Sequence, residues 1–231
     1  YKAYKVIYDF CNEDLSMYYL DMVKGRLYTA GAKASARRSA QTAVYEVLNV
    51  LVRITAPILV FTSEEIWQHM PKEKKDSAVA SVHLLDWPQV NPTFAQRDLP
   101  SEKSVGEELK IIMELIPDIA KAMEEKRSGG IIGSSFDAKI NLLTNNEIRY
   151  KYLESFKSDL PEIFKASQVA IIKQDAKRAN LTLSAKYTDV AIEILKAEGN
   201  KCVRCWNYSL AVGKNKAHSL ICDKCVKAIG G

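Results

Sequence analysis

Four cysteines near the C-terminus are the residues whose type and spacing point most directly to chemistry. Cys202 and Cys205 form one Cys-x-x-Cys pair, Cys222 and Cys225 form a second, and sixteen residues separate the two pairs. Each pair places two sulfurs on the same side of a tight turn, and two facing turns supply the four thiolates of a tetrahedral zinc site. The spacing therefore predicts one structural zinc ion bound by these four side chains.

Two other interpretations of the cysteines are disulfide bonds and packed free thiols. Disulfides form in an oxidising compartment, but we expect no secretory leader, and Cys11 would be left without a partner. Free thiols would not need the matched spacing. Protein sulfur would fill all four positions around the ion and leave none to activate water. We therefore expect the metal to stabilise the fold rather than to catalyse a reaction.

The net positive charge of the chain is concentrated around these cysteines. Residues 199–231 carry six bases against one acid, whereas the first 198 residues hold 27 bases and 27 acids. Four thiolates and one zinc ion add two negative charges, which leaves a formal charge of +3 on this module. Such a module favours a polyanionic partner such as RNA. Its basic residues are Lys201, Arg204, Lys214, Lys216, Lys224 and Lys227.

An aromatic side chain, Trp206, directly follows the second cysteine, and Tyr208 is close behind it. Aromatic rings beside cations suit an unpaired RNA base, because the cations hold the phosphates and a ring stacks on the base at roughly 1–3 kcal/mol per base. Alternatively, Trp206 packs on its own knuckle as part of a miniature core, which a small zinc module needs. The sequence leaves both possibilities open.

The totals allow a folded protein of one large or two to three small domains. The chain has 231 residues, of which 47% are hydrophobic, and this is enough to build real cores. We expect no membrane association, because no apolar run approaches the length of a bilayer span. Reduced cysteines at zinc-binding spacing favour the cytoplasm, and we expect a monomer.

The elements that must position these residues begin with helices. Apolar side chains recur at helical spacing between residues 14 and 28 and again between about 36 and 55, where Pro57 should end the second helix. Thr62-Ser-Glu-Glu65 has the pattern of a capping box and should begin a third helix that runs to Pro71. Three antiparallel helices would make a bundle. We expect an irregular segment to cover it, which gives a first domain of residues 1–103.

A second pattern follows at residues 104–198. A helix over 104–126 and a glycine-rich turn precede alternating apolar residues at 136–142, which indicate a strand, and Asn145 or Asn146 should cap the next helix. Three further strands are expected at about 169–173, 181–183 and 190–195. These elements predict a small α+β domain with a mostly antiparallel sheet. With the zinc knuckle at 199–231, the fold class is mainly α.

No grouping in the sequence has the signature of a catalytic site. The glycines at 129–133 lack the strand before them and the Lys-Ser/Thr that a phosphate-binding loop needs. No Ser, His and Asp grouping and no isolated pair of carboxylates stands out. We therefore expect no catalytic residue in this polypeptide.

Three segments at the N-terminal side closely resemble the anticodon-binding helical domain of bacterial isoleucyl-tRNA synthetases. They are Asp9-Phe-Cys-Asn-Glu-Asp-Leu-Ser-Met-Tyr-Tyr-Leu-Asp-Met-Val-Lys-Gly-Arg-Leu-Tyr28, Arg37-Arg-Ser-Ala-Gln-Thr-Ala-Val-Tyr45 and Ala56-Pro-Ile-Leu-Val-Phe-Thr-Ser-Glu-Glu-Ile-Trp67. Valyl, leucyl and methionyl enzymes have similar bundles. Three later segments narrow the choice, because they resemble the C-terminal region of the isoleucyl enzyme: Ser81-Val-His-Leu with Trp87-Pro88, Ile132-Gly-Ser-Ser-Phe-Asp-Ala-Lys-Ile140, and Glu198-Gly-Asn-Lys-Cys-Val-Arg-Cys-Trp206.

The resemblance implies a division of labour in a class I aminoacyl-tRNA synthetase. The full enzyme would activate isoleucine with ATP and Mg²⁺ and transfer it to its tRNA during protein biosynthesis. The family's His-x-Gly-His and Lys-Met-Ser-Lys-Ser signatures are not in these residues. We therefore expect this piece to lack the catalytic domain, to be inactive alone, and to recognise the anticodon stem and loop of the isoleucine tRNA.

The resemblance also implies which residues meet the RNA. The bundle should cradle the anticodon arm and the zinc module should close over the loop, with Arg204 and Trp206 placed to touch it. We expect further contacts from Lys201, Arg26, Arg37 and Arg38. The alternative is a zinc-stabilised module that binds another protein and has no RNA specificity. Salt separates the two, because phosphate contacts weaken steeply as salt rises.

Overall fold

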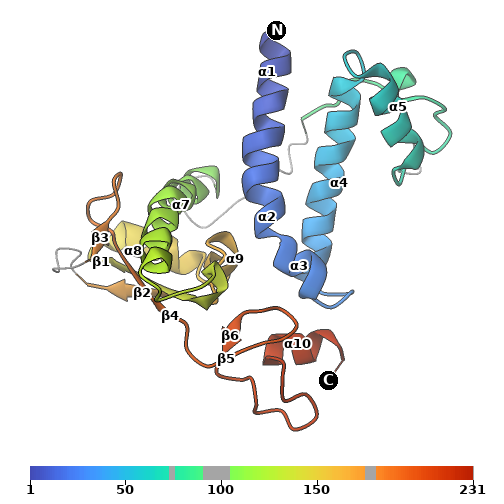
Figure 1. The fold of residues 1–231 in the computed structure, drawn as a ribbon. Coiled ribbons are helices and arrows are strands. Elements are labelled where there is room, and N and C mark those ends of the chain that lie inside the picture. The colour runs from blue at the N-terminus through green and yellow to red at the C-terminus, as the bar shows by residue number, and fades with distance from the viewer. Residues whose placement is uncertain (73–75, 91–104, 175–180, 231) are drawn as a thin grey trace. The chain divides into compact units, whose positions relative to one another are not determined.

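The computed structural model describes residues 1–72, 76–90, 105–174 and 181–230 (Figure 1). The chain forms two compact units, one of residues 1–34 and 99–231 and the other of residues 35–98. The boundary predicted between residues 103 and 104 lies outside the described residues. Within them, no helix is both long enough and apolar enough to cross a membrane.

The first unit begins with a nearly continuous helical stretch. It comprises α1 (Lys2–Asp9), the π-helical segment η1 (Phe10–Tyr19), α2 (Leu20–Met22) and α3 (Lys24–Thr29). The helix predicted over 14–28 is therefore present, and its apolar stripe includes the buried Val23. The stretch ends at Ala30, whose backbone is extended.

The unit of residues 35–98 contains α4 (Ser35–Thr55), α5 (Val60–His69) and the short 3₁₀ helix η3 (Val82–Leu84). Its core lies between α4, α5 and the described part of the covering segment, from which Val79, Val82 and Leu85 pack against the helices. Trp67 donates its ring N–H to the carbonyl of Val79 at 3.3 Å, and this bond fixes the segment. The buried apolar residues are Val52, Ala56, Trp67, Met70 and Val82.

The capping box predicted at Thr62–Glu65 is wrong. Helix α5 already begins at Val60, so Thr62 lies inside its first turn. The hydroxyl of Ser63 is 3.0 Å from that of Thr55 in α4. Glu64 instead accepts hydrogen bonds from the hydroxyl of Ser81 at 2.8 Å and the backbone N–H of Val82 at 3.0 Å. These polar residues therefore fasten neighbouring segments rather than start a helix.

A four-stranded sheet and its helices make up the middle of the chain. The elements are α7 (Val105–Ser128), η4 (Ser135–Asp137), β1 (Ala138–Thr144), α8 (Glu147–Ser155), α9 (Leu160–Ile163), β2 (Gln168–Lys173), β3 (Thr182–Leu183) and β4 (Ala191–Lys196). The strand order is β2-β1-β4-β3. Strand β1 pairs parallel with β2 and antiparallel with β4, and β3 pairs antiparallel with β4. The mostly antiparallel sheet is confirmed.

One large apolar core lies between the sheet and the helices that cover it. Ile140 and Leu142 of β1 are fully buried, as are Ile112 and Leu115 of α7. Asn146 caps α8 by accepting hydrogen bonds from two backbone N–H groups at 3.1 Å, as the sequence predicted. The strand begins two residues later than predicted, because residues 135–137 first make a 3₁₀ turn whose Asp137 accepts from the backbone N–H of Ser134 at 2.9 Å.

The C-terminal knuckle consists of β5 (Asn200–Lys201), β6 (Tyr208–Ser209) and α10 (Asp223–Ala228), with β5 and β6 antiparallel. Side chains of the sheet region hold it in place. Ser167 accepts a hydrogen bond from the backbone N–H of Tyr208 at 2.7 Å. Gln168 exchanges two hydrogen bonds with the backbone of Glu198, at 2.9 and 3.0 Å. The mainly helical chain with a sheet and a four-cysteine knuckle matches the predicted fold class.

A candidate metal centre and nucleic-acid interface

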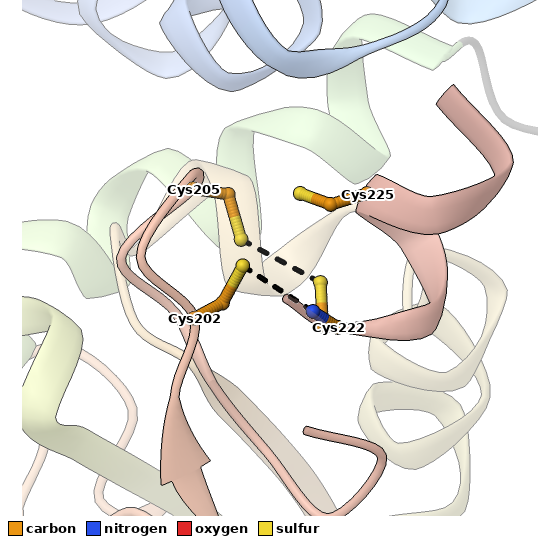
Figure 2. Close-up of side chains that lie close together, drawn as sticks. All are labelled: Cys202, Cys205, Cys222 and Cys225. Carbon is orange, nitrogen blue, oxygen red and sulfur yellow. Dashed lines mark hydrogen bonds between the residues drawn. The ribbon is translucent and has the colours of Figure 1, made fainter. Parts of the chain in front are cut away.

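Two structural elements present the cysteines to each other. Cys202 follows β5 and Cys205 lies in the turn before β6, while Cys222 precedes α10 and Cys225 lies within it. Figure 2 shows the pair from the hairpin facing the pair from α10, with the four sulfurs pointing into one space. The structure thus brings together all four side chains that the spacing singled out.

The distances between the sulfurs fit a tetrahedral metal. All four Sγ atoms lie within 4.8 Å of one another, and those of Cys205 and Cys222 are 3.7 Å apart (Figure 2). A zinc–sulfur bond of about 2.3 Å in a regular tetrahedron requires sulfurs about 3.8 Å apart. One zinc ion therefore fits between these four atoms without a change of fold.

Backbone N–H groups favour a thiolate at Cys202. Burial raises the pKa of this thiol, but backbone N–H groups of Cys205, Cys222 and Arg204 outweigh that effect and lower the pKa to about 6. The N–H of Cys222 is 3.3 Å from the Cys202 sulfur. Burial raises the pKa of Cys205 and of Cys222. Without a cation, the site would resist holding four negative charges at once, and a divalent metal supplies the compensation.

Few apolar side chains surround the sulfurs. The buried cluster of the knuckle consists of three of the cysteines and Val212, with Cys205 and Ile221 packed against it. Trp206 is not part of it, because its side chain is 61% exposed. The backbone of Trp206 is left-handed, with φ of 67°, and its N–H donates to the carbonyl of Cys202 at 2.9 Å. This turn directs the ring away from the cluster, so the miniature core is built without it.

The basic residues of the knuckle fall into two groups. Lys201, Lys214, Lys216 and Lys227 are exposed, and Lys201 lies 4.0 Å from a carboxylate oxygen of Asp137. In contrast, Lys224 pairs with Glu162 at 2.9 Å, and Arg204 contacts the backbone carbonyl of Thr29. The knuckle therefore carries both exposed cations and the exposed ring of Trp206.

The three arginines predicted to contact RNA from outside the knuckle also differ in exposure, and one of them forms ion pairs within the protein. Arg26 of α3 is part-buried and forms ion pairs with both Asp159 and Glu162. Burial lowers the pKa of its guanidinium, and the two carboxylates outweigh that effect and raise it. Arg38, near the start of α4, is exposed, and Arg37 beside it is half-buried. Arg26 therefore already has two anionic partners in the protein.

Sequence reasoning missed three residues that place the knuckle. Glu162 binds two cations from different segments, Ser167 binds the backbone of β6, and Gly199 joins the knuckle to β4. Gly199 has φ of 89°, and a Cβ there would lie 2.4 Å from the backbone of Ser209. The one available signal was the glycine in Glu198-Gly-Asn200, since a conformation with positive φ favours this residue.

Comparisons with known proteins agree with this architecture. Residues 1–142 match the model of the anticodon-binding domain of tRNA ligase. Residues 199–228 match a zinc finger found in FPG and IleRS. The zinc-finger match and the cluster of four cysteines together support one structural zinc ion.

Several curated relatives are all isoleucine–tRNA ligases and are much longer than this chain. The isoleucine–tRNA ligases of Caldanaerobacter subterraneus subsp. tengcongensis and Syntrophotalea carbinolica are 39% identical over 230 residues and 37% identical over 226 residues. The alignments cover 99% and 98% of this chain but 24% and 23% of those proteins. The chain therefore spans about a quarter of the length of these relatives, and the resemblance predicted from its motifs is confirmed. By its match over residues 1–142, the chain belongs to the family of anticodon-binding domains of tRNA ligases.

Proposed function

We propose that this chain is the part of an isoleucine–tRNA ligase that recognises the anticodon stem and loop of the isoleucine tRNA. The family match over residues 1–142 and the relatives named isoleucine–tRNA ligase support this proposal. The observation that carries it is the exposed ring of Trp206 on a basic, four-cysteine knuckle. An exposed ring beside cations offers both contacts that an unstacked RNA base needs.

The whole protein would attach isoleucine to its tRNA at the expense of ATP. ATP and Mg²⁺ would bind in a catalytic region outside this chain, which spans about a quarter of its relatives. The present residues would raise the fidelity of that reaction, because holding the anticodon end of the tRNA fixes where its acceptor end lies. We also place the protein in the cytoplasm, where cysteines stay reduced, and we propose that it is a monomer.

In the knuckle, Cys202, Cys205, Cys222 and Cys225 would bind one zinc ion. With four protein sulfurs around it, the ion would supply no catalytic function and would hold the β5–β6 hairpin against α10. A three-part division follows from this proposal, with residues 1–103 for the helices, 104–198 for the sheet and 199–231 for the metal.

Among the predicted RNA contacts, exposure favours Trp206, Lys201 and Arg38. Lysine and arginine side chains at the surface can neutralise phosphates at little cost, and the ion pair of Lys201 with Asp137 is a long one at 4.0 Å. Arg37 stays a candidate on the same helix as Arg38. Arg26 and Arg204 have partners within the protein, so an RNA phosphate would have to compete with these.

Two matched tryptophans provide the test. Trp206 and Trp87 are each 61% exposed, so Trp206→Ala and Trp87→Ala remove similar amounts of exposed aromatic surface at two different positions. In titrations of the zinc-loaded chain with isoleucine tRNA, we expect Trp206→Ala to weaken binding by roughly 1–3 kcal/mol and Trp87→Ala to leave it unchanged. A tRNA with an altered anticodon should bind more weakly than the isoleucine tRNA to the unmodified chain.

Other outcomes would count against the proposal. Equal affinity for the two tRNAs would remove the claim of anticodon recognition. Affinity that is nearly the same at about 50 and 200 mM salt would argue against phosphate contacts and for a module that binds another protein. Loss of zinc in Trp206→Ala, together with loss of affinity, would assign this ring to the stability of the knuckle.

A further inference from the structure

Arg204 lies between the two cysteines of the first pair and contacts two segments far from it in the sequence. Its Nη1 donates a hydrogen bond to the backbone carbonyl of Thr29, the last residue of α3. The same nitrogen is 3.6 Å from the sulfur of Cys225 in α10. One guanidinium group therefore joins a helix end to a cysteine of the candidate metal centre.

A nearby cation stabilises both partners of Arg204, the carbonyl of Thr29 and the sulfur of Cys225. The last carbonyls of a helix have no N–H partner within the helix, and the C-terminal end carries partial negative charge. An arginine near that end satisfies both needs. A thiolate bound to zinc is likewise a hydrogen-bond acceptor, and donors to such a ligand fix its orientation. Arg204 thus couples the geometry of the metal centre to the end of α3.

A second set of contacts joins the same elements. Glu162 accepts from Lys224 of α10 at 2.9 Å and also from Arg26 of α3. Burial raises the pKa of Glu162, but Arg26 and Lys224 outweigh burial and lower it, so the carboxylate is charged at neutral pH. Close packing accompanies these charges, because a Cβ at Gly31 would lie 3.3 Å from the carbonyl oxygen of Ala228.

We propose that Arg204 is a positioning residue that fixes the zinc knuckle on the carboxyl end of α3, and that it is not a phosphate contact. This inference rests on the proposed function. It adds a distinction between residues that contact RNA and residues that position them. Trp206 is two residues beyond Arg204 in the same turn. Holding Arg204 at α3 therefore fixes the direction of the ring before RNA arrives and reduces the ordering cost of binding.

Salt dependence distinguishes a positioning residue from a phosphate contact. Removing one phosphate contact lowers the slope of log affinity against log salt by about 1. We compare Arg204→Met, which removes the charge, with Lys201→Met, an exposed lysine of the same hairpin. We expect Lys201→Met to reduce the slope, and Arg204→Met to lower tRNA affinity roughly tenfold with the slope unchanged.

Arg204→Lys gives an independent answer. A lysine keeps the charge for a phosphate, but its ammonium nitrogen ends one atom short of the position of Arg204 Nη1 and sits on a flexible stem, so it does not reach both Thr29 and Cys225. We expect it to behave like Arg204→Met. Near-normal binding by Arg204→Lys, or a slope reduced as in Lys201→Met, would overturn the proposal.

Hydrogen exchange tests the contact without RNA. In the zinc-loaded 231-residue chain, we expect Arg204→Met to speed exchange of the Leu27, Tyr28 and Thr29 amides on the order of tenfold, while β1 amides and zinc content stay unchanged. Unchanged exchange at α3 would overturn the proposal even if tRNA binding is lost. If the unmodified chain binds no tRNA, the proposed function fails, and this exchange result still decides whether Arg204 holds α3. If Arg204→Met loses zinc, Glu162→Gln replaces it as the test, because this variant leaves the cysteines untouched. We then expect Glu162→Gln to speed amide exchange at α3, and unchanged exchange would refute docking of the knuckle on α3.

Discussion

Two neighbouring parts of one compact unit build their interiors from different materials. In the described residues of the sheet region, eighteen buried apolar side chains form one cluster that spans α7, β1 and the helices after it. In the knuckle, the corresponding cluster holds three cysteines and a single valine. The first interior is stabilised by removing apolar area from water, and the second has too little such area to fold by that means alone.

The contrast follows from chain length. Residues 199–228 match a zinc finger, and so short a segment buries too small a fraction of its surface for an independent core. Four cysteine sulfurs around a cation replace that missing core. The sheet region, by comparison, needs only its apolar pattern. Changes aimed at one interior should therefore leave the other intact, and this expectation can be tested.

Removing the metal should have the largest effect. Binding of a structural zinc ion is worth about 10–16 kcal/mol in small zinc modules, so a strong chelator should unfold residues 199–230. The sheet has its own apolar core, and we expect it to persist. Hydrogen exchange should show amides of α10 losing protection while those of β1 retain it.

Zinc added back to the reduced chain should restore that protection, and magnesium should not, because thiolates are poor ligands for a hard cation. A knuckle that keeps its protection without metal would show that the cysteines form an ordinary core. Simultaneous loss of the sheet would show that the two interiors are one cooperative unit.

A cavity in the sheet core should have the next largest effect. Leu142 of β1 is fully buried, and Leu142→Ala should reduce the free energy of unfolding by about 2–5 kcal/mol. The zinc content should not change. Leu183→Ala on β3 serves as the control, because that leucine is 46% exposed and its loss should cost well under 1 kcal/mol. Urea denaturation followed with zinc analysis measures both quantities.

The metal site was the part of the molecule most accessible from the sequence. Its ligands come as two local pairs, so the spacing alone predicted that four sulfurs would meet. The helix cap at Asn146 was predicted for the same reason, since a cap bonds to N–H groups two and three residues away. The apolar alternation placed β1 and β4 within two residues of their positions in the structure.

Contacts between distant segments could not be predicted in this way. Arg26 meets Glu162 across 136 positions of the chain, and no local pattern records that proximity. Arg204 was expected at the RNA from the family resemblance, and no local pattern indicated that its guanidinium contacts α3. The capping box failed for a related reason: Ser63 and Glu64 have partners in other segments. The partners of these polar side chains come from segments that only the tertiary fold brings together, so the sequence alone does not reveal them.

The connection between the two interiors is the next target. Gly199 adopts φ of 89°, and a Cβ would lie 2.4 Å from the backbone of Ser209, so Gly199→Ala should cost up to about 3 kcal/mol. Gly213→Ala is a matched control, because Gly213 also has positive φ, 95°, but no atom lies within 4 Å of the added carbon. The difference between the two variants isolates the steric clash. Equal thermal stability of the two variants would mean that the backbone around Gly199 rearranges freely.

The smallest expected effect comes from the carboxylate that joins α3 to α10. Glu162→Gln should lower stability at pH 7 by about 1 kcal/mol, since it weakens an ion-pair network at the protein surface. Glu154→Gln is the control, because Glu154 forms a local ion pair with Lys157, three residues further along the chain. We expect the control to be nearly silent in urea denaturation.

The pH dependence of that difference follows from the pKa of Glu162. Its pKa in the folded state lies below the ordinary value of 4.5, through Arg26 and Lys224 acting against burial. A carboxylate with a lowered pKa stabilises the fold above its unfolded value, and that contribution is lost as the pH falls below 4.5 and through the folded pKa. The gap in stability between the unmodified chain and Glu162→Gln should therefore be full at pH 7 and shrink below pH 4.5. Metal release at low pH acts on both proteins and largely cancels in the difference. A gap that stays constant with pH would mean that Glu162 joins the two interiors by packing rather than by charge.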